Sequence, residues 1–344
     1  MSIPLPTLFL HVGSHKTGTT ALQTFSVTNR ELLRRHGLLY PDFSPFLSGP
    51  ANGHHAWAHA FSASPRSLSR SQACELLSTW REVALQQQLS VVVSAEALYR
   101  HVLGQGSFLD KRRHYLQVVR DALTGFNVVP VLVLRRPDDY VRSLYQEAVA
   151  LRSVPRRLPG FSVYLKKRPS GVDYFDNAMV IEQVFGTVKV LCYEDLAAST
   201  SSLAEAFYSA LGYPLSGETC VTDIVRASLS AEETLVKNEF NDLLETRADS
   251  KHFISMMRTA PMQALLRHEY PDPPYSLWPG AAARLAFFES RERDLDALRQ
   301  RYFPDRLELF RPPQQASSVV TAAPPSKSLL EQLRACLPAN RSAI

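Results

Sequence analysis

The chain has 344 residues, of which 45% are hydrophobic, and this is enough for a substantial core in one large domain or two ordinary ones. Its formal net charge of +5, with both signs spread along the chain, suits a protein that binds an anionic ligand but is too weak to predict nucleic-acid binding. The four cysteines form no C-x-x-C pair, which excludes a disulfide scaffold or a cysteine zinc site by spacing. No signal peptide or apolar run of membrane-spanning length is found, so we expect a soluble protein of a reducing cytoplasm.

Residues 8–20 are typical of a short buried strand, a tight turn and the start of a helix. The apolar residues of this strand suit an environment that is covered on both faces, and Gly13 ends it. The helix is expected to begin at Thr19 and to run to about Arg35, because its apolar positions lie close to one helical face. Gly37 stands just after this helix, where a glycine commonly ends a helix.

The turn has the composition of an anion-binding site. A strand, turn and helix in this order direct unpaired N–H groups and the positive end of the helix dipole at one point, which attracts phosphate. Lys16 adds a mobile positive charge, Gly18 lets the backbone approach a ligand, and the threonine hydroxyls add donors. The predicted binding residues are Ser14, His15, Lys16, Thr17, Gly18, Thr19 and Thr20.

The position of the lysine in the turn separates this chain from common nucleotide-binding proteins. A Walker A loop has the pattern G-x-x-x-x-G-K-[ST], with its lysine after the second glycine. Here Lys16 precedes Gly18, and this order disfavours an ordinary ATPase or GTPase. A plain strand-to-helix turn with a solvated lysine is the simpler alternative.

Residues 38–70 are predicted to form an irregular, exposed connection that contains several histidines. His54 and His55 are candidates for a general base, although they would equally suit the start of a helix. His55 and His59 would share a helix face, but no nearby carboxylate or cysteine completes a set of metal ligands. We therefore expect no metal here.

A helix over residues 70–89 leads into a second buried strand at 91–96, which ends at Glu96. Open α/β sheets bind ligands beyond the carboxyl ends of their strands, so Glu96 is a candidate catalytic residue. A carboxylate that only stabilises a helix start is an equal alternative. In the next helix, over 110–124, the charges of Lys111, Arg112 and Arg113 are expected on a solvated face.

Residues 128–146 contain a second motif that suits phosphate binding. A third buried strand ends at Arg135, and Pro137 suits the first turn of the helix that follows. Ser143 stands eight residues after Arg135, in the second turn of that helix. An arginine fork at a strand end and a hydroxyl on the next helix could hold one phosphate from two sides.

Both motifs resemble those of one enzyme family. Gly-Ser-His-Lys-Thr-Gly-Thr-Thr at 13–20 closely resembles the 5′-phosphosulfate loop of sulfotransferases that use 3′-phosphoadenosine 5′-phosphosulfate (PAPS). Arg135, Pro137 and Ser143 resemble the 3′-phosphate motif of the same family, about 120 residues further on. Arg136 stands where many members have asparagine and Tyr140 where many have arginine, and neither departure touches the pair Arg135 and Ser143.

The resemblance implies a P-loop-like, three-layer α/β fold, with a central, mainly parallel sheet flanked by helices and a helical C-terminal part. It also implies PAPS as co-substrate, bound by the loop and by Arg135 and Ser143. The strand at 188–192 with Tyr-Glu-Asp-Leu after it resembles another feature of the family, and its carboxylates are expected to satisfy a helix start or hold a neighbouring loop. Arg226, just before a helix that opens with a capping box of Ser230 and Glu233, is a weaker cofactor-binding candidate.

We expect a sulfotransferase domain over residues 1–312, with a helix over 282–302. Residues 313–344 are predicted to be a flexible Pro/Ser/Ala-rich tail with a short helix near 329–336. The basic segment 154–171 has two equal interpretations. It could be a mobile lid that covers either the cofactor or an acidic acceptor, or it could be a solvated loop.

The expected reaction moves a sulfuryl group from PAPS to a hydroxyl or amine and releases 3′,5′-ADP. Lys16 would stabilise the charge on the departing phosphate, and the base would be His15, His54, His55 or Glu96, with Glu96 and the pair His54 and His55 favoured. A glycan or glycolipid precursor is the expected acceptor, while a peptide tyrosine, a lipid or a small phenol stays open. The alternatives are a nucleotide-dependent kinase or phosphotransferase, and a non-catalytic nucleotide- or glycan-binding module.

Overall fold

The computed structural model describes residues 4–48, 52–151, 154–166, 171–199, 201–215, 228–271, 274–313 and 320–335. The chain divides into two compact units. Unit 1 consists of Met1–Arg136, Asp173–Val225 and Asp294–Leu309, and unit 2 of Pro137–Val172, Arg226–Arg293 and Phe310–Ile344. The expected boundary at residue 312 stays a prediction.

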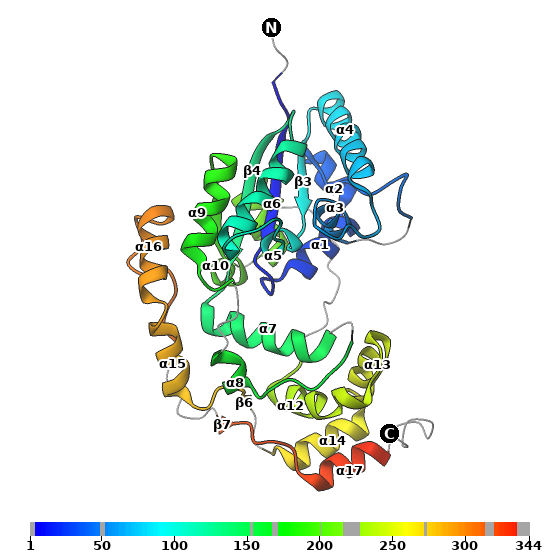
Figure 1. Ribbon diagram of the computed structural model, residues 1–344, viewed down its shortest axis with the longest axis vertical. Helices are drawn as coiled ribbons and strands as arrows, with labels where there is room; N and C mark the ends of the chain where they lie inside the picture. Colours follow the sequence, from blue (N-terminus) through cyan, green and yellow to red (C-terminus); the bar gives the residue numbers. More distant parts are fainter. Residues whose placement is uncertain are drawn as a thin grey trace. The chain divides into compact units, whose positions relative to one another are not determined.

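Unit 1 is built on a parallel sheet with the strand order β2-β3-β1-β4-β5 (Figure 1). The strands are β1 (Thr7–Gly13), β2 (Leu38–Leu39), β3 (Ser90–Ser94), β4 (Asn127–Leu134) and β5 (Lys189–Cys192). Each neighbouring pair runs in parallel, so the carboxyl ends of all five strands lie at one edge. The loop after β1, Glu96 after β3 and Arg135 after β4 therefore meet at this edge.

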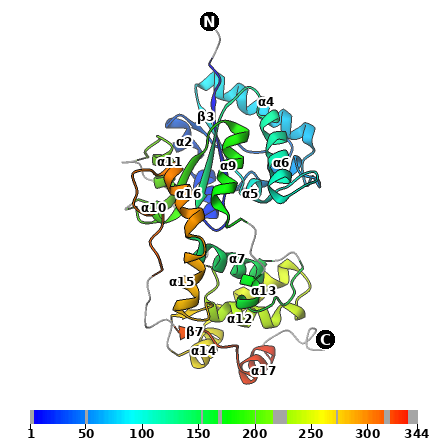
Figure 2. The same ribbon diagram turned by 60° about the vertical axis from the view of Figure 1, so that its left-hand side comes forward.

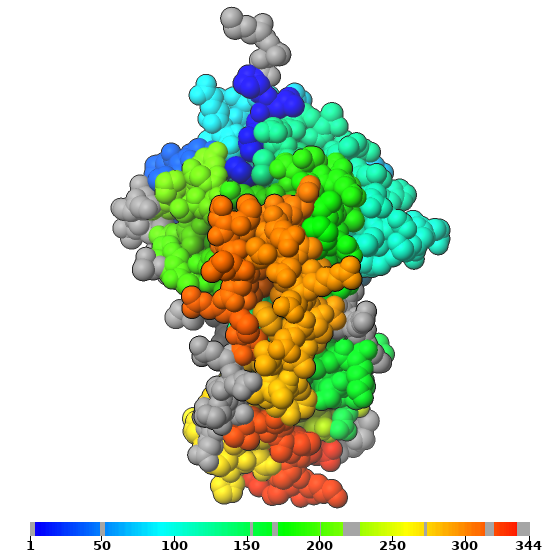
Figure 3. All heavy atoms as spheres, turned by 90° about the vertical axis from the view of Figure 1, so that its left-hand side faces the viewer, coloured from blue at the N-terminus to red at the C-terminus, as the bar shows by residue number. Residues whose placement is uncertain are grey.

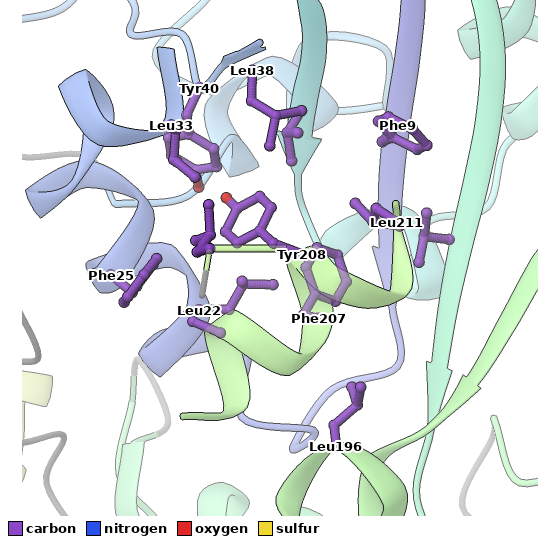
Figure 4. Packing of buried hydrophobic residues seen from close by; sticks show 14 of the residues in the cluster. Phe9, Leu22, Phe25, Leu33, Leu38, Tyr40, Leu196, Phe207, Tyr208 and Leu211 are labelled. Atoms are coloured by element: carbon purple, nitrogen blue, oxygen red, sulfur yellow. The ribbon is translucent and has the colours of Figure 1, made fainter. Parts of the chain in front are cut away.

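Helices cover both faces of the sheet. On one face, Phe9, Val92, Val131 and Val133 pack with α1 (Thr19–Thr28) and α11 (Leu203–Ala210), as Figure 4 shows around Phe207 and Tyr208. Alternate strand residues point to the opposite face and are equally buried, among them Leu8, Leu10, Val91, Val93, Leu132 and Leu134. That face carries α6 (Phe108–Ala122) and α9 (Tyr174–Phe185), which pack on each other (Figure 1). The predicted fold class, a central parallel sheet flanked by helices, is confirmed.

Unit 1 contains further helices around this core. They are α2 (Arg30–Arg35), α3 (His55–Ala60), α4 (Arg70–Gln87), α5 (Ala97–Arg100), α10 (Tyr193–Ala197) and most of α16 (Glu292–Tyr302). Figure 3 shows α16, in orange, on the outside of α9, in green. There Arg301 and the hydroxyl of Tyr302 both donate to the carboxylate of Glu182.

Three expectations for unit 1 were wrong in detail. The connection over 38–70 is not exposed throughout, because it contains β2 and α3 and buries Tyr40, Phe43 and Trp57. The helix expected from Thr19 to Arg35 breaks at Asn29, whose backbone leaves the helical conformation with φ −109° and ψ 28°. The side-chain amide of Asn29 donates to the carbonyl of Phe25 in the preceding turn, which is a local bond that competes with a continuous helix. Arg112 is fully buried rather than solvated, since its guanidinium donates to the carbonyls of Leu98 and Tyr99 and lies over the Tyr99 ring.

Unit 2 is mainly helical. Its elements are α7 (Pro137–Leu151), α8 (Phe161–Lys166), α12 (Ala231–Phe240), a 3₁₀ turn (Asn241–Leu243), α13 (Arg247–Met257), α14 (Ala260–Glu269), α15 (Ala281–Glu289), α17 (Lys327–Ala335) and the paired strands β6 (Tyr275–Ser276) and β7 (Val320–Thr321). The capping box of Ser230 and Glu233 is present. The expected helix over 282–302 is two helices, α15 and α16, and α8 lies within the basic segment expected to lack periodicity.

The helix near the C-terminus belongs to the core of unit 2. Leu329 and Leu333 of α17 are buried in a cluster with Met262 and Leu266 of α14 and with Phe253 of α13. Figures 1 and 2 both show α17 beside α14. In the described part of the chain, no helix combines the length and apolar character needed to cross a membrane.

Candidate active site

The loop after β1 is bent by three residues with left-handed backbone conformations and is fixed to the sheet. Gly13, Lys16 and Gly18 have φ values of +100°, +63° and +73°. Ser14 donates its N–H and its hydroxyl to the carbonyl of Val133 on β4, at 2.7 and 3.1 Å. Thr17 donates its hydroxyl to the carbonyl of Ser14 at 2.8 Å. These two hydroxyls hold the shape of the loop, a role that the sequence did not assign to them.

The loop leads into the N-terminus of α1, which no described side chain caps with a hydrogen bond. Gly18 is the N-cap residue, no side chain caps the helix, and its first turn contains no acidic residue. A Cβ on Gly18 would lie 2.9 Å from Cδ1 of Leu203, the mobile end of a side chain that can move aside, so the left-handed conformation is the main reason for glycine here. The first N–H groups of α1 are therefore open to an anion.

Lys16 supplies a cation to this loop. Within the residues that the structure describes, no hydrogen-bond or ion-pair partner is found for its ammonium group. A half-buried lysine without a carboxylate beside it favours a bound anion at this position. Thr19 is buried and Thr20 is exposed, on the first turn of the helix.

Arg135 joins the end of β4 to the same loop. Its Nη1 donates to the carbonyl of Lys16 at 2.9 Å, and its guanidinium lies 5.0 Å from the ring centroid of Tyr193. The carbonyl of Arg135 accepts the hydroxyl of Tyr174 at 2.8 Å. The next residue, Arg136, donates its N–H to Glu194 at 2.8 Å, so this carboxylate holds a neighbouring loop, one of the two roles predicted for it.

Two predicted cofactor ligands lie outside unit 1. Ser143 is on α7 of unit 2 and is buried there. Arg226 lies outside the described residues. Both stay predictions from the sequence motif.

Glu96 and His55 form a polar pair at the end of β3. Nε2 of His55 lies 3.2 Å from Oε2 of Glu96, and Nε2 of Gln23 donates to the same oxygen at 2.9 Å. Glu96 stands at the N-cap position of α5, where the helix dipole favours a carboxylate, but its side chain makes no capping hydrogen bond there. A Cβ on Gly13 would lie 3.0 Å from Cβ of Glu96, which shows how closely the pair adjoins the loop.

The charges around Glu96 favour its ionised form. Burial acts to raise the pKa of Glu96, but the hydrogen bond and charge of His55 outweigh burial and hold this pKa at about 2. At neutral pH Glu96 is therefore a carboxylate that accepts hydrogen bonds.

His54 lies deeper, with both ring nitrogens bonded to backbone groups. Its Nδ1 accepts the N–H of Ser94 at 3.0 Å, so Nε2 carries the proton and donates to the carbonyl of Pro41 at 3.1 Å. The ring packs against Tyr40 and Trp80, and burial lowers the pKa of His54 to about 4. This arrangement holds His54 in the core.

Two further polar residues of this network were not predicted from the sequence. Gln23 and His11 are buried, and both contact Ser94: Gln23 donates to Ser94 Oγ at 3.1 Å, and Nδ1 of His11 lies 2.9 Å from it. A polar residue on the apolar side of a helix, as Gln23 is on α1, is the signal that could have marked Gln23. His15 of the loop is half-buried, and burial and the charge of Arg100 lower the pKa of its ring to about 3.

Among the described residues no set of metal ligands is found, and a pocket of unit 1 lies apart from the candidate site. In the described ranges, no three residues of the types His, Cys, Asp and Glu gather as a metal site. His59 packs instead on the ring of His101. A pocket of about 300 Å³ lies elsewhere in unit 1, lined by α2, β2 and α4, and it contains none of the candidate residues.

Comparison with known proteins adds one weak likeness. No family model and no curated protein matches the chain. Its structure is similar to the crystal structure of a sulfotransferase from Alicyclobacillus acidocaldarius, with 18% sequence identity and a TM-score of 0.36 over 72% of this chain and 95% of that chain. A likeness at this level does not assign a function.

Proposed function

We propose that this protein is a PAPS-dependent sulfotransferase that transfers a sulfuryl group to a hydroxyl or amine of a glycan or glycolipid precursor. One observation carries the proposal: the ammonium of Lys16, without a partner in the described residues, stands on a left-handed loop before the uncapped N-terminus of α1. This is the arrangement that a bound phosphate requires. Lys16 precedes Gly18, unlike the lysine of a Walker A loop, which disfavours a nucleoside triphosphate, and the loop resembles the phosphosulfate loop of sulfotransferases.

Sulfuryl transfer places charge where this loop has its donors. The acceptor oxygen attacks sulfur, and the bond from sulfur to the bridging oxygen breaks, which leaves negative charge on the 5′-phosphate. Lys16 and the first N–H groups of α1 stabilise that charge as it develops. Because the leaving group is a single phosphate that is already held by donors, the chemistry requires no metal in principle.

Arg135 is proposed to bind the 3′-phosphate of the same nucleotide. It is one residue beyond β4 and is linked to the loop through the carbonyl of Lys16. Its planar fork suits bidentate contact with a phosphate. Ser143 and Arg226 are proposed as further ligands on the basis of the sequence motif alone.

The acceptor loses a proton during the transfer, and the Glu96–His55 pair is proposed to take part in its removal. The pair adjoins the loop through Gly13, and its surroundings include the polar side chain of Gln23. His54 is not proposed as the base, since both of its ring nitrogens are engaged in the core.

Calorimetric titration tests the cofactor assignment. We expect 3′,5′-ADP to bind without metal, and Lys16→Met and Arg135→Ala each to weaken binding about tenfold or more, the worth of a hydrogen bond to a charged group. Lys111→Met on the surface of α6 is the matched control and should leave binding unchanged. Stronger binding of ATP–Mg²⁺ that is insensitive to Arg135→Ala would instead support a phosphotransferase.

A further inference from the structure

The carboxylate of Glu96 receives two donors on a single oxygen. Oε2 lies 2.9 Å from the amide nitrogen of Gln23 and 3.2 Å from Nε2 of His55. A carboxylate that accepts two hydrogen bonds is stabilised in its charged form and becomes a weaker base. This arrangement suits a residue that orients a neighbour better than one that takes a proton itself.

The ring of His55 meets Glu96 through one defined nitrogen. Because Nε2 faces a carboxylate, the neutral ring keeps its proton on Nε2, and Nδ1 is left with its lone pair. For this Nδ1, no partner is found in the part of the chain that the structure describes. The side chain of His55 is 38% exposed, against 13% for Glu96, so the histidine is the more accessible of the two.

Gln23 is itself held in one orientation. Its Nε2 also donates to the hydroxyl of Ser94 at 3.1 Å and lies 3.4 Å from the Ser94 carbonyl, so the amide NH₂ group, and not the amide oxygen, faces this cluster of acceptors. On its other side, a Cβ built on Gly53 would lie 2.5 Å from the Gln23 amide. Gly53 therefore leaves the space that the glutamine fills.

We propose that His55 is the base of the transfer, acting through Nδ1, and that Glu96 and Gln23 are positioning residues that fix its ring. The inference rests on the proposed function and assigns the proton within it. As the acceptor oxygen bonds to sulfur, its proton passes to Nδ1, and the electron pair of the broken sulfur–oxygen bond stays on the 5′-phosphate of 3′,5′-ADP. The imidazolium that results keeps its Nε2–H directed at the Glu96 carboxylate, which stabilises it.

Nitrogen NMR of labelled, ligand-free protein tests the orientation without any turnover. In the wild type we expect the neutral ring of His55 to carry its proton on Nε2. In Glu96→Leu, which removes the acceptor of both donors, the ring should lose this preference and populate both neutral tautomers. The surface variant Glu82→Leu, on α4, is the control and should leave the ring unchanged. A wild-type proton on Nδ1, or a ring that does not respond to Glu96→Leu, would overturn the proposal.

Release of sulfate from PAPS, with water in place of the acceptor, gives the second readout. We expect His55→Gln to lower this rate by about 100-fold or more and Gln23→Leu by about tenfold, with little change in affinity for 3′,5′-ADP. A rate that His55→Gln does not reduce would contradict the assignment of the base. Failure of the protein to bind 3′,5′-ADP at all would instead refute the proposed function, and the NMR result would still decide the orientation of His55.

Discussion

The backbone of Gly13 lies against the side chain of Glu96, so closely that a Cβ on Gly13 would come within 3.0 Å of Cβ of Glu96. This contact joins the end of β1 to the turn after β3. It brings the loop that is proposed to hold the phosphosulfate next to the pair that is proposed to accept the proton. The spacing between the phosphate-binding loop and the Glu96–His55 pair thus depends on the packing of the Gly13 backbone against Glu96 in unit 1.

Gly13→Ala should damage both parts at once. Its φ of +100° is costly for any residue with a Cβ, and the new methyl group would press on Glu96. Gly186→Ala is the matched control, because Gly186 has a φ of +81° and open space around its Cβ position. We expect both variants to lose about 1–2 kcal/mol of unfolding free energy from backbone strain, and only Gly13→Ala to weaken 3′,5′-ADP binding as well. Equal affinities in the two variants would argue against the contact.

His54 should make unit 1 sensitive to acid. Burial lowers the pKa of His54 from 6.5 to about 4, so the unfolded chain binds more protons than the folded one between these values. The contribution of His54 to the unfolding free energy is therefore complete above pH 6.5 and is lost as the pH falls toward 4. Its size is on the order of 3 kcal/mol.

His54→Gln removes this titrating group, while the buried His11 and His15, whose pKa values burial also lowers, remain. Denaturant unfolding over this pH range should show a shallower pH dependence in the variant, by up to about one proton. An unchanged slope would mean that His54 is not the buried neutral base described here.

Arg284 of α15 should be important for the stability of unit 2. Its Nε donates to the fully buried carboxylate of Asp138 at 2.6 Å, and its Nη2 to Asp139 at 3.1 Å, both at the start of α7. Arg284→Ala leaves the buried Asp138 without its arginine, so we expect a loss of about 3–5 kcal/mol.

The exposed pair of Arg157 and Glu239, also in unit 2, offers a matched comparison. Arg157→Ala should cost about 0–1 kcal/mol, because water screens the pair. Calorimetric unfolding of the two variants measures the difference, and similar losses in both would refute the importance of burial.

The parts of this fold that depend on local pattern could be predicted from the sequence. The apolar runs predicted β1, β3, β4 and β5, and the order of glycine and lysine predicted the loop. The break at Asn29 and the burial of Arg112 depend on hydrogen bonds to particular carbonyls, which neither periodicity nor charge reveals.

Within the candidate site, local sequence also fails to distinguish the roles of His54 and His55. The two are adjacent in the chain, and only the contact of His54 with Ser94 and Pro41 shows which of them is buried in the core. The place of Gln23 in this network depends on Gly53, whose missing side chain leaves room for the Gln23 amide. The two residues are distant in the chain, so a local pattern does not reveal the relation.

Phosphorus NMR of 3′,5′-ADP bound to the protein tests the central claim most directly, because it distinguishes the two phosphates of one ligand. If the loop holds the 5′-phosphate and Arg135 the 3′-phosphate, both resonances shift on binding to the wild type. Lys16→Met should then alter the shift of the 5′-phosphate, and Arg135→Ala that of the 3′-phosphate. Resonances that stay at their free positions, or that respond alike to the two variants, would contradict the account.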